Sequence, residues 1–266
     1  MSTSPIRVEI DGRTATADQL RHPALVNYGH FTTMQVRDRR TRGLDLHLRR
    51  LDAATRELFD ATLDTGRIRD YVRHAVAELR DASVRVSVYR PDTDDTVSVD
   101  DAVSIMVAVR PPADMPANPV RFESVPYRRP VPHIKHAGGF AQIYYGRLAE
   151  RHGFDDALLT GPGGDISEGA ISNVAFYDGT TVIWPDAHFL LGITMQLMEP
   201  RLAGAGLPTL RGPVRLADLP SFAAAFVTNS RGIAPVGRID GTILPIDPPL
   251  MKTVTEIYES IAWDPI

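Results

Sequence analysis

A proline-rich segment near the middle of the chain constrains the fold more than any other feature of the sequence. Residues 111–119 contain four prolines, Pro111, Pro112, Pro116 and Pro119. Because proline lacks a backbone N–H and has a fixed φ, this segment cannot continue a helix or a central strand. We therefore predict a linker over residues 113–119, between an N-terminal α/β domain (1–112) and a C-terminal barrel-like α+β domain (120–266).

Apolar patterns predict strands and two helices before the linker. Alternating apolar residues predict strands over residues 7–10, 31–36, 84–89 and 103–109. Apolar residues at helical spacing predict helices over residues 45–59 and 67–79. The acidic segment 92–101 lacks the glycine and the terminal glutamate of a calcium-binding loop, so we expect a solvated turn there.

Short strands and hairpins predominate after the linker. Glycine-containing turns predict that strand 157–160 pairs with 166–167 and that strand 173–177 pairs with 181–184. Further strands are expected over residues 223–228 and 236–239, and helices over 140–151, 194–202 and 249–261.

Lysine is scarce in this chain. Only Lys135 and Lys252 are lysines among its 29 lysines and arginines, which fits a coding bias that favours arginine. An arginine stays protonated and cannot form an imine, whereas a desolvated lysine can. Lys252 lies in a polar helical stretch and is expected to be a surface charge. Lys135 is therefore the candidate catalytic residue.

Composition argues against several classes of protein. Without cysteine the chain cannot form a disulfide scaffold, a zinc ribbon, an iron–sulfur site or a thiol nucleophile. The net charge of -4 argues against nucleic acid as the main partner. No apolar run reaches the roughly 18–20 residues of a membrane span, and the first residues lack the regions of a signal peptide. We therefore expect a soluble cytoplasmic protein. His133 and His136 flank Lys135, but no further ligands are placed beside them, so no metal site is predicted.

Four polar clusters interrupt the apolar pattern. They contain Arg50, Lys135, Glu168, and a Gly-Ile-Thr segment at 192–194 with an Asn-Ser pair at 229–230. Taken singly, each has an ordinary explanation, such as a surface charge or a helix cap. Together, an arginine, a helix start and an Asn-Ser turn can hold a phosphate, because N–H groups at a helix N-terminus point at an anion. A lysine, a glutamate and a phosphate site are what pyridoxal phosphate (PLP) needs.

The order and spacing of these residues resemble the fold-type IV (class IV) PLP-dependent aminotransferases. That family includes branched-chain and D-amino-acid aminotransferases and aminodeoxychorismate lyase. The resemblance extends from about Gly29 to Asp240 and rests on five motifs. They are His-x-x-Arg-Leu at 47–51, Lys135, Glu-Gly-x-x-x-Asn at 168–173, Gly-Ile-Thr at 192–194, and Thr-Asn-Ser-Arg-Gly-Ile-Ala-Pro-Val at 228–236. The resemblance implies an α+β, two-domain fold like that of D-amino-acid aminotransferase, with the cofactor at the domain interface.

The resemblance also implies a role for each matched residue. Lys135 is the catalytic residue that forms an aldimine with PLP. The implied cofactor-binding residues are Arg50, Glu168, Ile193, Thr194, Asn229 and Ser230. The implied substrate-binding residues are Phe31, Arg85 and Arg231.

Several departures from the family pattern affect the expected substrate. Residues 138–140 are Gly-Gly-Phe where many members have an Asn-Tyr pair, so the tyrosine that often orients the lysine is missing or comes from elsewhere. Phe31 stands where D-amino-acid transaminases have a tyrosine, and no Arg-x-His pair follows Tyr89. These differences count against D-amino-acid specificity. The loop at 228–230 is more similar to that of the lyases.

The resemblance therefore implies an aminotransferase that moves an amino group between an amino acid or amine and an oxo acid. An aminodeoxychorismate lyase, which forms 4-aminobenzoate and pyruvate, is the alternative. A catalytically inactive binding protein of the same fold is a second alternative. The family also implies a homodimer in which loops of one subunit complete the other's pocket. The expected partners are small amino and oxo acids, and the identity of the substrate stays open.

Overall fold

The computed structural model describes residues 7–91 and 103–266. These residues form two compact units. The first comprises the described residues up to Ala113, together with Ile134–Gly138 and Ala262–Ile266, and the second comprises Asp114–His133 and Gly139–Ile261. The domain ranges given above stay a prediction. The acidic segment 92–101, for which a solvated turn is predicted, lies outside the described residues.

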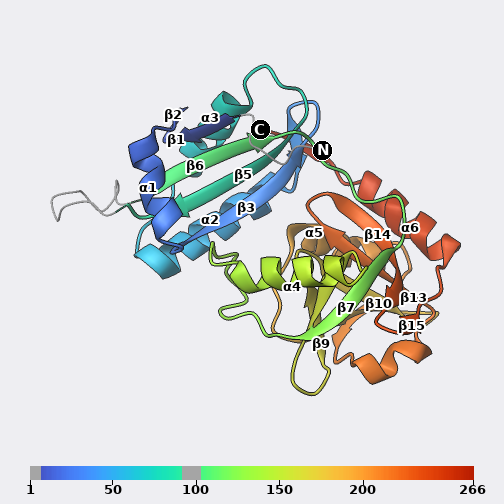
Figure 1. Cartoon of the computed structure of the whole chain (residues 1–266). Helices are drawn as coiled ribbons and strands as arrows, with labels where there is room; N and C mark the ends of the chain where they lie inside the picture. Colours follow the sequence, from blue (N-terminus) through green and yellow to red (C-terminus); the bar gives the residue numbers. More distant parts are fainter. Residues whose placement is uncertain (1–6, 92–102) are drawn as a thin grey trace. The chain divides into compact units, whose positions relative to one another are not determined.

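The first unit contains a five-stranded antiparallel sheet with helices on one face (Figure 1). The strands are β1 (Arg7–Ile10), β2 (Arg13–Thr14), β3 (Gly29–Val36), β5 (Ala82–Tyr89) and β6 (Ser104–Arg110), in the order β2-β1-β6-β5-β3. The helices α2 (Leu44–Phe59) and α3 (Thr65–Val76) follow β3 in the chain. Leu51, Val72 and Val86 lie in one buried cluster that joins the helices to the sheet. Alternation along each strand sends one set of side chains into this core and the other set to the opposite face.

Some elements of the first unit differ from the prediction. The helix α1 (Ala17–Leu25) buries no side chain, so it carries no apolar stripe by which sequence could reveal it. Its N-terminus is fixed by a capping box between Thr16 and Gln19. The helix α3 ends at Val76 rather than at residue 79, because Ala77 has a left-handed φ of 47°. Two short strands, β4 (Arg40–Arg42) and β16 (Trp263–Pro265), pair with each other although they lie at opposite ends of the chain.

The second unit is built around a curled sheet of mixed strands. Its strands are β7 (Val120–Pro126), β8 (Asp156–Thr160), β9 (Ile166–Gly169), β10 (Asn173–Tyr177), β11 (Val182–Pro185), β12 (Thr209–Gly212), β13 (Ala224–Asn229), β14 (Gly232–Ile239) and β15 (Thr242–Ile243). The order is β12-β11-β10-β13-β14-β7-β8-β9, with β15 paired to β14. The Ile166 N–H donates to the Val214 carbonyl oxygen at 2.8 Å, and the Leu216 N–H donates to Gly164 at 3.0 Å. These bonds connect the β8–β9 hairpin to the segment after β12.

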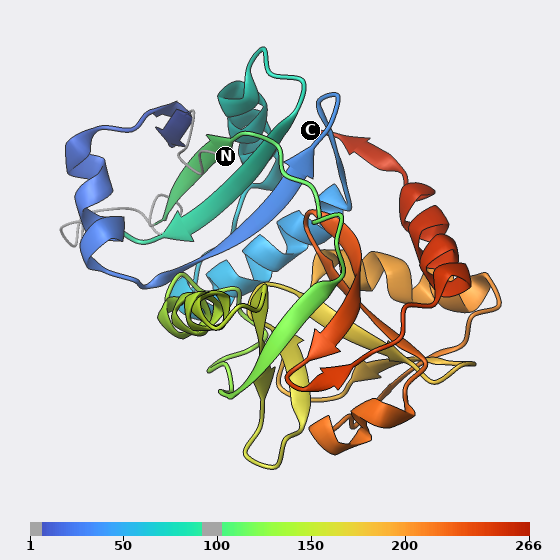
Figure 2. The same ribbon diagram turned by 45° about the vertical axis from the view of Figure 1, so that its right-hand side comes forward.

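Three α-helices and a short 3-10 helix pack against this sheet. They are α4 (Phe140–Arg151), α5 (Ile193–Gly204), η2 (Leu216–Ser221) and α6 (Pro248–Glu259). Figure 2 shows α5 and α6 beside each other, and Met198, Phe226 and Val254 from α5, β13 and α6 lie in one buried cluster. The predicted hairpins β8–β9 and β10–β11 are confirmed, as is the range of α4. The sequence analysis predicts no strand at the position of β7.

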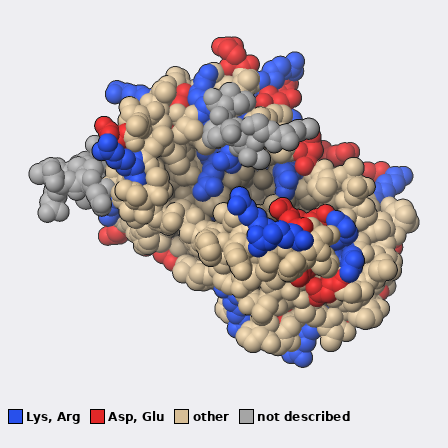
Figure 3. Space-filling model, viewed as in Figure 1, with Lys and Arg blue, Asp and Glu red and all other residues tan. Residues whose placement is uncertain are grey.

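Basic and acidic side chains are interspersed on the face shown in Figure 3. Arg121 and Asp155 form one exposed ion pair, with an N···O distance of 2.9 Å. Arg211 and Glu199 form another, at 2.7 Å. Among the helices within residues 7–91 and 103–266, none has the length and apolar character needed to cross a bilayer.

Candidate active site

Lys135 lies on a short segment that extends the edge of the five-stranded sheet. The Phe31 N–H donates to the Lys135 carbonyl oxygen at 2.9 Å, and the Ala137 N–H donates to the Gly29 carbonyl oxygen at 2.7 Å. These bonds hold residues 134–138 along β3. The Lys135 Nζ lies 5.0 Å from the centroid of the Phe31 ring. The predicted catalytic lysine is thus beside one of the predicted substrate residues.

Arg50 projects from α2 toward β3. Its Nη2 donates to Thr32 Oγ1, which also lies 2.6 Å from His47 Nδ1. Burial, followed by the positive charges of Arg50 and Lys135, holds the pKa of His47 well below 6.5. Burial and the charge of Arg50 likewise lower the pKa of His30 to about 4. Both imidazoles are therefore neutral at pH 7, and positive charge near β3 comes from Arg50 and Lys135, which suits an anionic group.

Arg85 on β5 packs against the ring of Phe31. Its Cζ lies 3.6 Å from the ring centroid, and its Nε donates to Ser87 Oγ at 3.2 Å. Burial and the neighbouring charge of Arg110 lower the pKa of Arg85 to about 10, so the guanidinium is still cationic at neutral pH. Phe31 is therefore the common neighbour of Arg85 and Lys135.

Glu168 lies on β9 in the second unit and is buried. Its Oε2 accepts a hydrogen bond from the Leu190 N–H at 3.2 Å, and its Oε1 lies 3.9 Å from Arg129 Nη1. Burial lowers the pKa of Arg129, and the charge of Glu168 opposes this shift. The Arg129 guanidinium and the Leu190 N–H both favour the charged carboxylate of Glu168.

The start of α5 meets the end of β13 in the same unit. The Thr194 hydroxyl donates to the Asn229 carbonyl oxygen at 2.7 Å, and Asn229 Oδ1 accepts from the Arg231 N–H at 2.8 Å. Asn173 fixes the preceding loop, because its Oδ1 accepts from the Gly192 N–H at 3.1 Å and its Nδ2 donates to the Leu190 carbonyl oxygen at 2.8 Å. No side chain within the described residues caps the N-terminus of α5. Its first N–H groups are therefore suited to an anion.

The structure places the predicted site residues in two groups. Phe31, Arg50, Arg85 and Lys135 belong to the first unit. Glu168, Ile193, Thr194, Asn229, Ser230 and Arg231 belong to the second.

Sequence reasoning missed two side chains that contact these groups. Thr32 bonds both Arg50 and His47, and Arg129 faces Glu168. Alternation along β3 places Thr32 on the face of the sheet that packs against the helices. The alternating sequence pattern could therefore have indicated that Thr32 faces the helices. Arg129 follows Arg128 in a segment without regular structure, where no periodicity shows which of the two arginines is buried.

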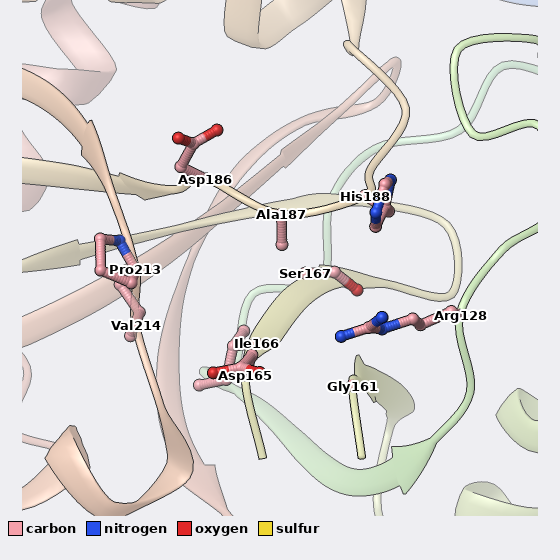
Figure 4. Close-up of a pocket in the computed structure, with 10 residues that line it drawn as sticks. All are labelled: Arg128, Gly161, Asp165, Ile166, Ser167, Asp186, Ala187, His188, Pro213 and Val214. Atoms are coloured by element: carbon pink, nitrogen blue, oxygen red, sulfur yellow. The ribbon is translucent and has the colours of Figure 1, made fainter. Parts of the chain in front are cut away.

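A cavity of about 400 Å³ lies elsewhere in the second unit (Figure 4). It is lined by Arg128, Gly161, Asp165, Ile166, Ser167, Asp186, Ala187, His188, Pro213 and Val214. Ser167 is the neighbour of Glu168 on β9, and successive strand side chains point to opposite faces. Since the lining includes none of the predicted cofactor residues, this cavity is not the predicted PLP site.

Comparison with known proteins identifies the family of the chain. The family model for amino-transferase class IV matches residues 29–239, which is most of the chain. The chain therefore belongs to the class IV aminotransferases and is an enzyme of that family. A search of curated proteins finds no match.

Solved structures share the fold over nearly the whole chain. A branched-chain aminotransferase from Thermoproteus uzoniensis, with norvaline, has a TM-score of 0.80 and 20% identity, covering 96% of this chain and 94% of its own. A hypothetical aminotransferase from Mycobacterium tuberculosis, in its PLP-bound form, has a TM-score of 0.81 and 22% identity, covering 96% and 98%. A candidate 4-amino-4-deoxychorismate lyase from Legionella pneumophila has a TM-score of 0.79 and 19% identity, covering 91% and 93%. At these identities the likeness shows the fold, and it confirms the predicted α+β, fold-type IV class.

Proposed function

We propose that this enzyme is an aminotransferase that moves an amino group between an amino acid or amine and an oxo acid. Pyridoxal 5'-phosphate is its cofactor. The observation that carries the proposal is the position of Lys135, which two backbone hydrogen bonds hold along β3 beside Phe31. Only a lysine amine can form the imine that PLP chemistry requires, and the sole other lysine is Lys252, whose side chain is exposed on α6.

The residues present fit this cofactor. Arg50 and Lys135 supply positive charge, and the N-terminus of α5 offers backbone N–H groups for a phosphate. The hydroxyl oxygen of Thr228, next to Asn229, is buried without a hydrogen-bond partner among the described residues. Glu168 provides a buried carboxylate for the pyridine nitrogen. We propose Arg50, Ile193, Thr194, Asn229 and Ser230 as phosphate-side residues and Glu168 as the pyridine-side residue.

When bound, PLP supplies an electron-withdrawing ring that stabilises negative charge developing at the substrate α-carbon. The Lys135 Nζ would hold the cofactor, and once the substrate amine has taken its place the freed Nζ would carry the proton that leaves the substrate α-carbon. The Glu168 carboxylate, oriented by the Leu190 N–H, would accept a hydrogen bond from the pyridine nitrogen and keep it protonated. Phe31 lies beside the Lys135 amine. We propose that Arg85 and Arg231 bind a carboxylate of the substrate.

A substitution at Lys135 tests the proposal. The wild-type protein, purified with PLP, is expected to keep a visible absorption band after dialysis. Borohydride reduction should fix the cofactor to the peptide that contains Lys135. Lys135→Ala should lose both signals and amino transfer, whereas Lys252→Ala should keep all three. Persistence of the band and of turnover in Lys135→Ala would contradict the assignment, as would a wild-type protein that stays colourless with PLP.

An aminodeoxychorismate lyase is the second candidate, because the Thr-Asn-Ser form of the loop at 228–230 is more similar to the lyases. A lyase needs no amino acceptor. Release of 4-aminobenzoate from aminodeoxychorismate, without any oxo acid, would select the lyase. Amino transfer that depends on an added oxo acid would select the aminotransferase.

We also propose that the enzyme works as a homodimer, as the family resemblance implies. Sedimentation equilibrium of the PLP-loaded protein is expected to give twice the mass of one 266-residue chain. A monomer that is fully active at the same concentration would exclude this assembly.

A further inference from the structure

Two polar residues interrupt buried apolar rows beside Arg50. On β3, Thr32 shares the helix-facing side of the sheet with Met34 and Val36, and its side chain is fully buried. On α2, His47 lies one turn before Arg50 on the same side of the helix and is also buried. An apolar side chain at either position would continue the core. A hydroxyl and an imidazole placed there need hydrogen bonds to offset the cost of removing them from water.

The three polar side chains form a chain of hydrogen bonds whose direction follows from their donors. Arg50 has no acceptor, so Thr32 Oγ1 accepts the bond from its Nη2. The single hydroxyl proton of Thr32 then goes to His47 Nδ1, which lies 2.6 Å away. If His47 Nδ1 were the donor, the Thr32 proton would have no acceptor among the described residues. The direction is therefore Arg50 to Thr32 to His47, and the imidazole proton is assigned to Nε2.

The charge state of His47 agrees with this direction. Burial, followed by the positive charges of Arg50 and Lys135, holds the pKa of His47 well below 6.5, so its imidazole is neutral at pH 7 and Nδ1 can accept. The hydroxyl and the imidazole are thus both uncharged. They can orient the guanidinium of Arg50 without cancelling its charge.

The chain of hydrogen bonds fixes the direction of the Arg50 side chain. A guanidinium holds five N–H donors in one plane, so a bond at Nη2 sets the direction of the other donors. Thr32 itself is held by the sheet, because β3 pairs with β5 from Gly29 to Val36. Arg50 is therefore tied to a rigid strand and not only to its own helix.

We propose that Thr32 and His47 are positioning residues that aim the Arg50 guanidinium at the phosphate of the cofactor. Of the three, only Arg50 contacts the phosphate. The inference rests on the proposed function, because it takes Arg50 as a phosphate-side residue. Loss of the Thr32 hydroxyl should then weaken binding of the phosphate group and leave imine formation at Lys135 unchanged.

Comparison of two aldehydes separates this role from a general structural one. Pyridoxal has the ring and the aldehyde of PLP but no phosphate, so its binding reports on Lys135 without Arg50. The dissociation constants of both compounds would be measured from the visible absorption band. Thr32→Val, which keeps the shape and removes the hydroxyl, should weaken PLP binding roughly tenfold and change pyridoxal binding by less than about twofold. Thr32→Ser restores the hydroxyl and should keep the wild-type ratio of the two constants.

Variants at His47 test the other end of the chain. His47→Asn places an amide oxygen near the position of Nδ1 and should keep most of the preference for PLP, whereas His47→Leu should lose it. Thr55→Val is the matched control. The buried Thr55 hydroxyl lies 2.9 Å from His30 Nε2 and makes no hydrogen bond to Arg50, so this variant should keep the wild-type ratio.

Several outcomes would overturn the proposal. Equal losses for PLP and pyridoxal in Thr32→Val would mean that the hydroxyl supports the fold of the site and not the phosphate. An unchanged PLP affinity in Thr32→Val, a loss in Thr32→Ser as large as that in Thr32→Val, or the same loss in Thr55→Val would also overturn it. A wild-type preference for PLP in His47→Leu would overturn the role of His47.

Failure of the proposed function gives a different result. If the wild type forms no band with either aldehyde, the proposed function fails, and inorganic phosphate titrated into the unloaded protein tests the hydrogen-bond chain alone. Wild type should bind phosphate more tightly than Thr32→Val, and equal affinities or no binding by the wild type would overturn the proposal. Melting curves of the unloaded proteins show that each variant folds. If Thr32→Val does not fold, His47→Leu carries the same comparison with the same expected ratio.

Discussion

At the scale of single residues, Asp155 and Asp156 show how neighbouring carboxyl groups can have opposite effects on stability. Asp155 pairs with Arg121 at 2.9 Å, and the hydrogen bond from that arginine lowers its pKa. Burial raises the pKa of Asp156 from 3.8 to about 6, although the Ala157 N–H donates to its Oδ1 at 2.9 Å. The ionised form of Asp156 is therefore disfavoured in the folded chain.

The sign of the pH dependence follows from linkage. A carboxyl group with a raised folded-state pKa favours folding below about pH 4 and loses that contribution as the pH rises to about 6. Asp156→Asn should therefore raise the free energy of unfolding at pH 7.5, by about 2–3 kcal/mol at most, and change it little at pH 3.5. Asp155→Asn is the control and should lower stability at pH 7.5. Urea unfolding at the two pH values checks both, and a shift in the same direction for both variants at pH 7.5 would contradict the assignment.

At the scale of elements, the two ends of α5 offer a matched pair of glycines. A Cβ on Gly192 would lie 2.1 Å from the Oδ1 of Asn173, which holds the loop before the helix. A Cβ on Gly204, in the last turn, would meet nothing within 4 Å. Gly192 must therefore stay small, whereas Gly204 is free to change.

Gly192→Ala is expected to displace the Asn173 side chain and the start of α5, with a loss of roughly 2–4 kcal/mol in the free energy of unfolding. It should also weaken PLP binding, because the phosphate-side N–H groups move. Gly204→Ala should be neutral or stabilise the helix by about 0.5–1 kcal/mol. Thermal melts and PLP titration measure both effects. Equal behaviour of the two variants would show that the start of α5 is not tightly fixed.

At the scale of the whole molecule, a cofactor that binds only the folded chain must stabilise it by mass action. At PLP concentrations of about 100 times Kd the gain is about 2.7 kcal/mol, which corresponds to a rise of roughly 5–10 °C in Tm for a chain of this size. Differential scanning fluorimetry of wild type, Lys135→Ala and Lys252→Ala measures it. The rise should shrink in Lys135→Ala and persist in Lys252→Ala. A wild-type Tm unchanged by saturating PLP would contradict the cofactor-binding roles proposed above.

The sequence predicts those elements whose own side chains carry the signal. Apolar spacing locates α2, and glycine turns locate the β8–β9 and β10–β11 hairpins, because each signal arises from residues close together in the chain. The helix α1 buries nothing and gives no such signal. Strand β7 pairs in parallel with β14 and β8, which come from distant segments, so no adjacent hairpin turn indicates it in the sequence.

For the candidate site, the sequence by itself determined which residue types are available, above all the single lysine in a motif that PLP chemistry can use. Imine formation depends on an amine, which is a property of one side chain. Only the tertiary structure decided that the backbone of residues 134–138 lies along β3, that Arg129 rather than Arg128 faces Glu168, and that Arg110 lies beside Arg85. These contacts depend on strand register and on burial between segments far apart in the chain. These contacts therefore cannot be predicted from the identity or the spacing of residues that are close together in the sequence.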